Sequence, residues 1–179
     1  GGMASEVARA LGIDAVPEPA QRARELLSSG AVDGMLSPAE SVRSFGLERL
    51  LKHRTEVPGG LYNTSFAFVM NPHAWERIPK ADRRIVERLS GEVVAAHFGR
   101  YWDLEDRRSL ALQQAEGIRG LVAGDAFVAQ LRRRTAGIER AWIEMAEVEG
   151  LADAAGVLAE FRREIDSLGK AAGQGGRAR

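Results

Sequence analysis

The sequence predicts an α/β fold in which a small, mostly parallel sheet at the amino end is followed by long helices. Residues 3–12 and 19–30 carry apolar side chains at helical spacing, and short apolar segments at residues 15–16 and 35–36 follow them. Helices that alternate with short strands favour parallel pairing of those strands. From residue 80 to about residue 116 the helical pattern continues without a break, so we expect the carboxyl-terminal half to be mostly helical.

Two helix starts have strong local signals. Ser37 is placed to cap a helix, with Pro38 at the first helical position and Glu40 completing a capping box. Asn71 followed by Pro72 repeats the combination of a capping side chain and a proline. These residues predict helices that begin near residues 38 and 72.

Three further strands and the last two helices are predicted from the residues that form them and from those that begin or end them. Aromatic and branched side chains favour a strand at residues 61–70. Further strands are expected at residues 52–57 and, as a short segment, at residues 120–122. Asp125 is expected to begin a helix that Gly150 ends, and a last helix then runs to about residue 168.

The composition excludes several classes of protein. The chain has 179 residues, 45% of them apolar and 28% charged, which is typical of a soluble globular protein and sufficient for one folded unit. Lys plus Arg and Asp plus Glu each total 25, so no net field attracts nucleic acid or an anionic membrane. The absence of cysteine excludes disulfides and thiol nucleophiles. The amino end lacks the basic and apolar regions of a signal peptide, so we expect any export signal upstream of residue 1.

Catalytic and metal-binding patterns are not found in the sequence. His53, His73 and His97 do not form the paired spacing of a zinc protease, and no serine stands in a Gly-x-Ser-x-Gly motif. Asp103, Glu105 and Asp106 alternate with arginines in a predicted helix, a pattern typical of a solvated face. We therefore predict that the protein is not an enzyme and uses no cofactor. The residues assign no metal ligands, and whether a metal ion bridges the ligand is left open.

Two ordered series of short motifs resemble a known family. The first comprises VARALG at residues 7–12, VP at residues 16–17, ELL at residues 25–27, GAVDG at residues 30–34 and Pro38. The second comprises LLKHRT at residues 50–55, VMN at residues 69–71, Trp75, IP at residues 78–79 and Ile85. In order and spacing they resemble the second lobe of the DctP-type solute-binding proteins of TRAP transporters, and the resemblance covers residues 1–165.

The resemblance implies a periplasmic-binding-protein-like fold of two lobes that close over a ligand by a hinge motion. Ligands of that family are small carboxylates, held by an arginine whose planar fork pairs both oxygens. The family places this arginine, with the whole first lobe, before residue 1 of this chain, so the sequence resembles a fragment. The implied function is the capture of a small organic acid in the periplasm and its delivery to the membrane permease subunits.

The resemblance also implies contacts between particular residues and the ligand. Ser37 occupies a position where relatives place a ligand contact, although a plain helix cap explains it equally well. A second contact falls near Asn63, Thr64 or Ser65, which simple alternation on a half-exposed strand would also explain. Ala20 stands where some relatives place an aromatic side chain over the ligand. Gly1 and Gly2, at the beginning of a helix, could offer backbone N–H groups to an anion.

The corresponding division of the chain is a ligand-binding α/β lobe at residues 1–57, a crossover strand at 58–71, bracing helices at 72–168 and a disordered tail at 169–179. An alternative is a helical interaction or dimerisation module without a small ligand. That alternative requires Phe98, Tyr101 and Trp102 to be exposed, and a homodimer is possible under either interpretation. A small enzyme of unrecognised type is a third and weaker alternative.

Overall fold

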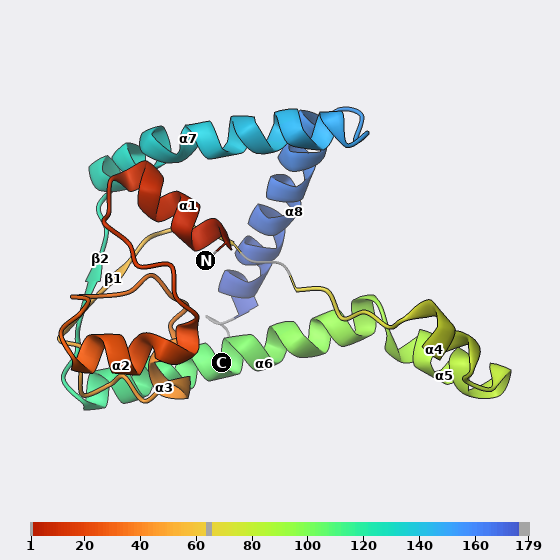
Figure 1. Ribbon diagram of the computed structural model, residues 1–179, viewed down its shortest axis with the longest axis horizontal. Coiled ribbons are helices and arrows are strands. Elements are labelled where there is room, and N and C mark those ends of the chain that lie inside the picture. Colours follow the sequence, from red (N-terminus) through yellow and green to blue (C-terminus); the bar gives the residue numbers. More distant parts are fainter. Residues whose placement is uncertain (1, 64–65, 176–179) are drawn as a thin grey trace. The chain divides into compact units, whose positions relative to one another are not determined.

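The computed structural model describes residues 2–63 and 66–175 (Figure 1). In chain order its elements are α1 (Gly2–Leu11), the 3-10 helix η1 (Ala20–Arg22), α2 (Ala23–Ser28), α3 (Glu40–Ser44), β1 (His53–Glu56), α4 (Pro72–Glu76), α5 (Lys80–Leu89), α6 (Glu92–Ala115), β2 (Arg119–Val122), α7 (Asp125–Val148) and α8 (Ala154–Gly175). The chain divides into two compact units, Gly1–Val128 and Ala129–Arg179, where the sequence predicted one. Among the described residues, no helix combines the length and the apolar character needed to span a bilayer.

The sheet consists of β1 and β2, which pair in parallel. Their register places His53 opposite Arg119 and Glu56 opposite Val122. Hydrogen bonds continue past both ends, because the Arg119 N–H donates to the Lys52 carbonyl at 2.9 Å and the Ala123 N–H donates to the Glu56 carbonyl at 2.8 Å. The predicted class, a small parallel sheet followed by long helices, is confirmed.

Three predicted strands are wrong where the structure describes them. Residues 15–16, 35–36, 61–63 and 66–70 are not in strands, and residues 64–65 lie outside the described part of the chain. A strand is stabilised by bonds and side-chain pairs with a neighbouring strand. Among the described residues only β1 and β2 provide such neighbours to each other. The sheet therefore joins residues far apart in sequence rather than the two helix–strand steps at the amino end.

The main apolar core of the first unit lies between α2, α3 and the residue that precedes β2. Leu47 is completely buried, and Val42 and Ile118 pack with it. Partly buried apolar side chains surround these three, namely Ala23, Leu27, Met35, Phe45, Leu50 and Leu51. The core thus fixes the segment between α2 and α3 that carries Ser37.

α3 ends in a backbone motif that directs Leu47 into this core. Gly46 has φ +62°, its N–H donates to the Arg43 carbonyl at 3.2 Å, and the Leu47 N–H donates to the Val42 carbonyl at 2.8 Å. This pair of bonds defines a Schellman motif, which is often accompanied by an apolar contact between the residues at its two ends. Here those residues are Leu47 and Val42, so the local motif and the tertiary core share the same side chains.

We expect Gly46→Ala to lower the free energy of unfolding by about 1–2 kcal/mol, because a Cβ is disfavoured in the left-handed region. The new Cβ would also lie 2.9 Å from Nη1 of Arg24, whose guanidinium donates to the Gly46 carbonyl and would have to shift. Gly12→Ala is the matched control, since Gly12 has φ +75° and a Cβ added there would meet only open space. Urea unfolding followed by circular dichroism should give a lower free energy of unfolding for Gly46→Ala than for Gly12→Ala. Equal stabilities would show that the Arg24 contact contributes nothing.

The helices between β1 and β2 begin mostly where predicted. The Asn71 side chain caps α4, since its Oδ1 accepts from the His73 N–H at 2.9 Å. The unbroken helix predicted for residues 80–116 is wrong in one respect, because α5 and α6 are separated at Ser90 and Gly91. Gly91 has φ +61° and ψ −132°, a conformation that a helix interior does not accept.

The second unit contains most of α7 and all of α8. Gly150, with φ +96°, ends α7 as predicted, and Asp153 caps α8 through a bond from the Gly156 N–H to its Oδ1 at 3.0 Å. Arg162 donates two bonds to the Glu139 carboxylate, at 2.8 and 2.7 Å, and so holds the pKa of Glu139 below its usual range. α8 extends to Gly175, beyond the predicted end near residue 168, and so includes residues 169–175, which were predicted as disordered. The four-part division of the chain stays a prediction.

Candidate ligand-binding site

The structure brings together the two segments in which ligand contacts were predicted. The Tyr62 hydroxyl donates to the Leu36 carbonyl at 3.4 Å. Leu36 precedes Ser37, and Tyr62 precedes Asn63, so these two candidate contact residues stand on neighbouring stretches of backbone. Ser37 is half-buried and Asn63 is exposed. Thr64 and Ser65, the other predicted contacts on this stretch, lie outside the described residues.

Ser37 is free to use its hydroxyl for a ligand. Within residues 2–63 and 66–175 no hydrogen bond engages its side chain, and the predicted role as a helix cap is wrong because α3 begins later, with Ala39 at the N-cap position. Burial raises the pKa of the neighbouring Tyr62 hydroxyl, since it disfavours the phenolate. Tyr62 therefore remains a neutral donor at physiological pH.

Side chains from α6 hold the backbone just after Ser37. The Ala39 carbonyl accepts from Ser109 Oγ at 2.6 Å and from Gln113 Nε2 at 3.1 Å. The Glu40 N–H donates to Asp106 Oδ1 at 2.8 Å. Asp106 thus supplies to α3 the cap that the sequence assigned to Ser37, although Asp106 lies 66 positions after Glu40 in the chain.

The predicted solvated face of α6 is only partly solvated. Glu105 pairs with Arg43 of α3 at 2.7 Å and with Arg108 of its own helix at 2.6 Å. The Glu105 side chain retains 12% of its exposure, whereas Arg43 retains 49%. Together with Asp106, Glu105 docks α3 against α6, an arrangement visible in Figure 1, where α3 lies beside the carboxyl-terminal half of α6.

The other two predicted contact residues stand on other elements. Gly2 begins α1, and Ala20 begins η1, and both are exposed. Within the described residues, no hydrogen bond or ion pair connects Gly2 or Ala20 with Ser37 or Asn63. Gly1 is outside the described residues. Contacts from Gly2 and Ala20 to a ligand stay predictions.

The histidines and carboxylates do not form a metal site in the part of the chain that the structure covers. No group of three or more potential ligands gathers there. His53 is exposed on β1, His73 Nδ1 lies 3.7 Å from Glu76 Oε2, and His97 Nδ1 lies 3.1 Å from Arg100 Nη2. All three are exposed.

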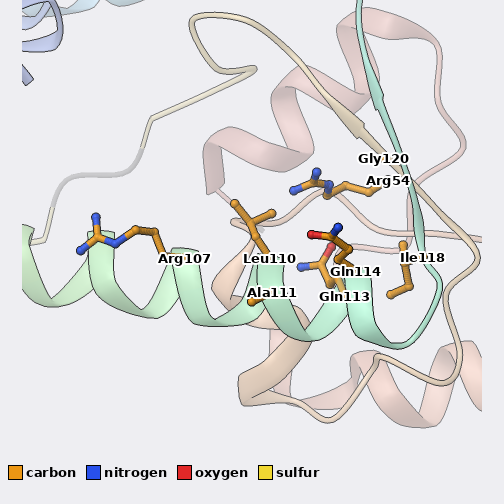
Figure 2. A pocket seen from close by; sticks show the side chains of 8 residues that line it. All are labelled: Arg54, Arg107, Leu110, Ala111, Gln113, Gln114, Ile118 and Gly120. Carbon is orange, nitrogen blue, oxygen red and sulfur yellow. The ribbon is translucent and has the colours of Figure 1, made fainter. Parts of the chain in front are cut away.

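A separate cavity of about 560 Å³ lies between α6 and the sheet (Figure 2). It is lined by Arg54, Arg107, Leu110, Ala111, Gln113, Gln114, Ile118 and Gly120. Arg54 lies over Gly120, where an added Cβ would come within 2.9 Å of its Nη2. Guanidinium and amide groups suit an anion, but Glu56 Oε2 already lies 4.0 Å from Arg54 Nη2. Ligand contacts at Ser37 and Asn63, to which the resemblance points, stay a prediction, and the site at these two residues remains the candidate.

Sequence reasoning missed the residues that hold this site. Asp106, Ser109 and Gln113 are spaced by three and four positions and therefore share one face of α6. Ser109 and Gln113 are 0% and 3% exposed, which is unusual for polar side chains. The sequence did contain a signal for them, because Ser109 and Gln113 lie on the same face of the predicted helix as the apolar Trp102, and polar residues on such a face indicate a specific hydrogen-bonding role.

In the described geometry, segments of an α/β unit that lie next to each other carry the polar residues Ser37 and Asn63. Residues 1–142 match the family described as bacterial extracellular solute-binding protein, family 7, also called DctP. The chain belongs to this family of solute-binding proteins.

The relatives that match include proteins solved with bound acids. A TRAP periplasmic solute-binding protein from Bordetella bronchiseptica, with bound (R)- and (S)-mandelate, has 41% sequence identity and a TM-score of 0.87, over 94% of this chain and 53% of that chain. A TRAP solute-binding protein from a marine metagenome, specific for aromatic acid ligands and bound to metahydroxyphenylacetate, has 29% identity and a TM-score of 0.76, over 86% and 49%. The outer membrane transporter protein TsaT of Comamonas testosteroni is 32% identical over 155 residues, which are 84% of this chain and 44% of TsaT.

The chain spans about half the length of these relatives. The resemblance to DctP-type proteins is confirmed, and so is the expectation that the fold corresponds to one lobe of a periplasmic binding protein. The family and its solved relatives are solute-binding proteins of transporters and not enzymes.

Proposed function

We propose that the protein is the solute-binding component of a TRAP-type transporter and that it captures an aromatic monocarboxylate. The observation that carries this proposal is the 41% identity and the TM-score of 0.87 with a solute-binding protein that holds mandelate. The second relative, which is specific for aromatic acids, supports the same ligand class. The ligand would be held between this lobe and a second one, and released to the membrane permease subunits.

The candidate contacts fit an acid with a polar substituent. The Ser37 hydroxyl and the Asn63 amide are uncharged donors, and they stand on adjacent backbone stretches. Uncharged donors complement a hydroxyl or one carboxylate oxygen, while the full negative charge requires a guanidinium. Ser65, Gly2 and Ala20 complete the set of proposed contacts, and Ala20 leaves space where an aromatic side chain would otherwise cover the ligand.

We propose a periplasmic location, because the TRAP relatives with known structures include one described as periplasmic. Export would require a signal peptide. Delivery to a membrane permease follows from the transporter class. A homodimer stays a prediction.

The helical-module alternative is not favoured. Phe98, Tyr101 and Trp102 are exposed, as that alternative requires. However, the family match over residues 1–142 extends across the α/β lobe as well as the helices, which a helical docking module would not need. Exposure of these aromatic side chains also follows if half of a two-lobed fold lies outside this chain.

The test uses an extended protein, defined as residues 1–179 preceded by an amino-terminal half, taken from the same gene or grafted from the Bordetella bronchiseptica relative. Isothermal titration calorimetry should show mandelate and benzoate binding with Kd values of about 1 μM or tighter. Benzyl alcohol lacks the carboxylate and should bind about 100-fold more weakly, because charge-assisted bonds are lost. Succinate, which lacks the ring, should also bind weakly.

The 179-residue chain alone is expected to bind mandelate at least about 100-fold more weakly than the extended protein, because half of the enclosing surface is missing. Equal affinity of benzyl alcohol and benzoate would contradict carboxylate capture. A folded extended protein that binds none of the acids would remove the proposed function altogether.

A further inference from the structure

Hydrogen bonds from side chains of α6 and from Tyr62 hold the backbone on both sides of Ser37. On the carboxyl side, the Ala39 carbonyl accepts from both Ser109 Oγ at 2.6 Å and Gln113 Nε2 at 3.1 Å, and Gln113 Nε2 also donates to Ser109 Oγ at 3.2 Å. The Glu40 N–H donates to Asp106 Oδ1 at 2.8 Å. The N-cap residue of α3, Ala39, and its first helical residue, Glu40, are therefore both held by α6.

The same loop is held on its amino side by a different segment. The Tyr62 hydroxyl donates to the Leu36 carbonyl at 3.4 Å, which places a bond one residue before Ser37. Ser37 thus lies between two anchored carbonyl groups, those of Leu36 and Ala39, while its own hydroxyl is unbonded within the described residues. A preorganised ligand contact requires backbone that is held in place on both sides of a side chain whose polar group is still available, and Ser37 meets both conditions.

The chemistry of the α6 side chains fits positioning better than simple packing. Ser109 and Gln113 are among the buried polar residues of the described chain, at 0% and 3% exposure. Burying polar groups is unfavourable unless they are bonded, and apolar side chains would dock α3 without that cost. Hydrogen bonds are directional, so they define the orientation of the Ala39 peptide in a way that apolar contact does not.

We propose that Asp106, Ser109 and Gln113 are positioning residues for the ligand site, which act by holding Ser37 in its binding orientation. This inference rests on the proposed function. A loop that is ordered before binding loses less conformational entropy when the ligand arrives. Loosening the loop should therefore weaken binding even though none of the three side chains touches the ligand.

The test measures Kd for mandelate by titration calorimetry on folded variants of the extended protein. Asp106→Ala, and the double variant Ser109→Ala with Gln113→Met, should each raise Kd about tenfold. Asp106→Asn keeps an acceptor for the Glu40 N–H and should stay within about twofold of the parent protein. Gln114→Met is the matched control for Gln113→Met, because Gln114 is exposed on the neighbouring position of α6.

A double-mutant cycle separates positioning from a merely structural role. In the Ser37→Ala background, Asp106→Ala should raise Kd less than about threefold, because the hydroxyl that it positions is gone. Amide hydrogen exchange at Glu40 reports independently whether the loop has loosened.

The outcomes distinguish this inference from the proposed function. If the parent protein binds mandelate and Asp106→Ala accelerates exchange at Glu40 without raising Kd, the positioning role is overturned while the proposed function stands. If the effects of Ser37→Ala and Asp106→Ala on the free energy of mandelate binding are fully additive, the positioning role is overturned as well. Failure of the parent protein to bind any carboxylate would overturn both. If the double variant does not fold, Asp106→Ala and Asp106→Asn decide the question, because Asp106 is only half-buried.

Discussion

Leu47→Ala is expected to lower the free energy of unfolding by about 3 kcal/mol, within the usual range of about 2–5 kcal/mol for a fully buried leucine. Leu47 is 0% exposed and packs with Val42 of α3 and with Ile118, which precedes β2. The substitution removes apolar contacts and leaves a cavity where two distant parts of the chain meet. Because Leu47 also follows the Schellman glycine Gly46, the end of α3 should loosen together with the core.

Urea unfolding of the 179-residue chain, followed by far-ultraviolet circular dichroism, measures this effect. Leu89→Ala is the matched control, since Leu89 is the same residue type in a helix but is 62% exposed. It should change the free energy of unfolding by less than about 0.5 kcal/mol. Similar losses for both variants would mean that Leu47 does not occupy a packed core in solution.

Helix ends were predictable from the sequence where the signal is local. Asn71 caps α4, and Gly150, with φ +96°, follows the end of α7 as predicted. Gly117, with φ +76°, follows α6, which was predicted to end near residue 116. Each of these residues acts through its own backbone conformation or through a bond to a residue two or three positions away. The break at Gly91 was missed because apolar side chains continue at helical spacing on both sides of it.

Strands were harder to predict because their stability depends on partners. Residues 66–70 consist of Phe, Ala, Phe, Val and Met, a composition that favours a strand, yet Phe68 is 90% exposed and no strand forms there. β1 and β2 were predicted and do form, since each finds the other across an interval that includes α4, α5 and α6. The sequence thus indicated segments capable of pairing, and pairing itself depended on the tertiary fold.

The candidate site shows the same division between local and distant causes. The resemblance pointed to Ser37 and Asn63, and the Tyr62 bond to Leu36 brings their segments together. The local capping rule for Ser37 failed because Asp106 of α6 supplies the bond to the Glu40 N–H instead. Spacing within a sequence cannot identify a partner 66 positions away, so the α6 side chains that hold the site became visible only in the fold.

An uncovered aromatic face on α6 leads to the second large prediction. Trp102 and Ser109 are seven positions apart, so at about 100° per residue they lie within about 20° of the same direction on the helix. α3 covers this face at Ser109, but toward the amino end of α6 it carries Phe98, which is 53% exposed. Tyr101, which is 61% exposed, lies beside it, about 80° from the direction of Ser109. The Phe66 ring stacks on Trp102 with centroids 6.2 Å apart and is itself exposed.

Phe98→Ala is expected to have different consequences in the two forms of the protein. In the 179-residue chain the side chain is half-exposed, so the free energy of unfolding should change by less than about 0.5 kcal/mol. In the extended protein, where we expect the amino-terminal half to cover this face, the loss should be about 3–5 kcal/mol, as for a buried phenylalanine. Arg107→Ala provides the control, because Arg107 projects from the opposite side of the same helix and should stay neutral in both forms.

Urea unfolding of both variants in both forms, combined with sedimentation of the 179-residue chain at several concentrations, decides what covers the aromatic face. If Phe98→Ala lowers the free energy of unfolding only in the extended protein, the amino-terminal half of a two-lobed fold covers the aromatic face. A concentration-dependent loss in the 179-residue chain itself, together with dimers that Phe98→Ala dissociates, would instead assign the face to a second copy of the chain. Neutral behaviour in both forms would show that an exposed face of this size carries no partner at all, which exposed aromatic clusters rarely do.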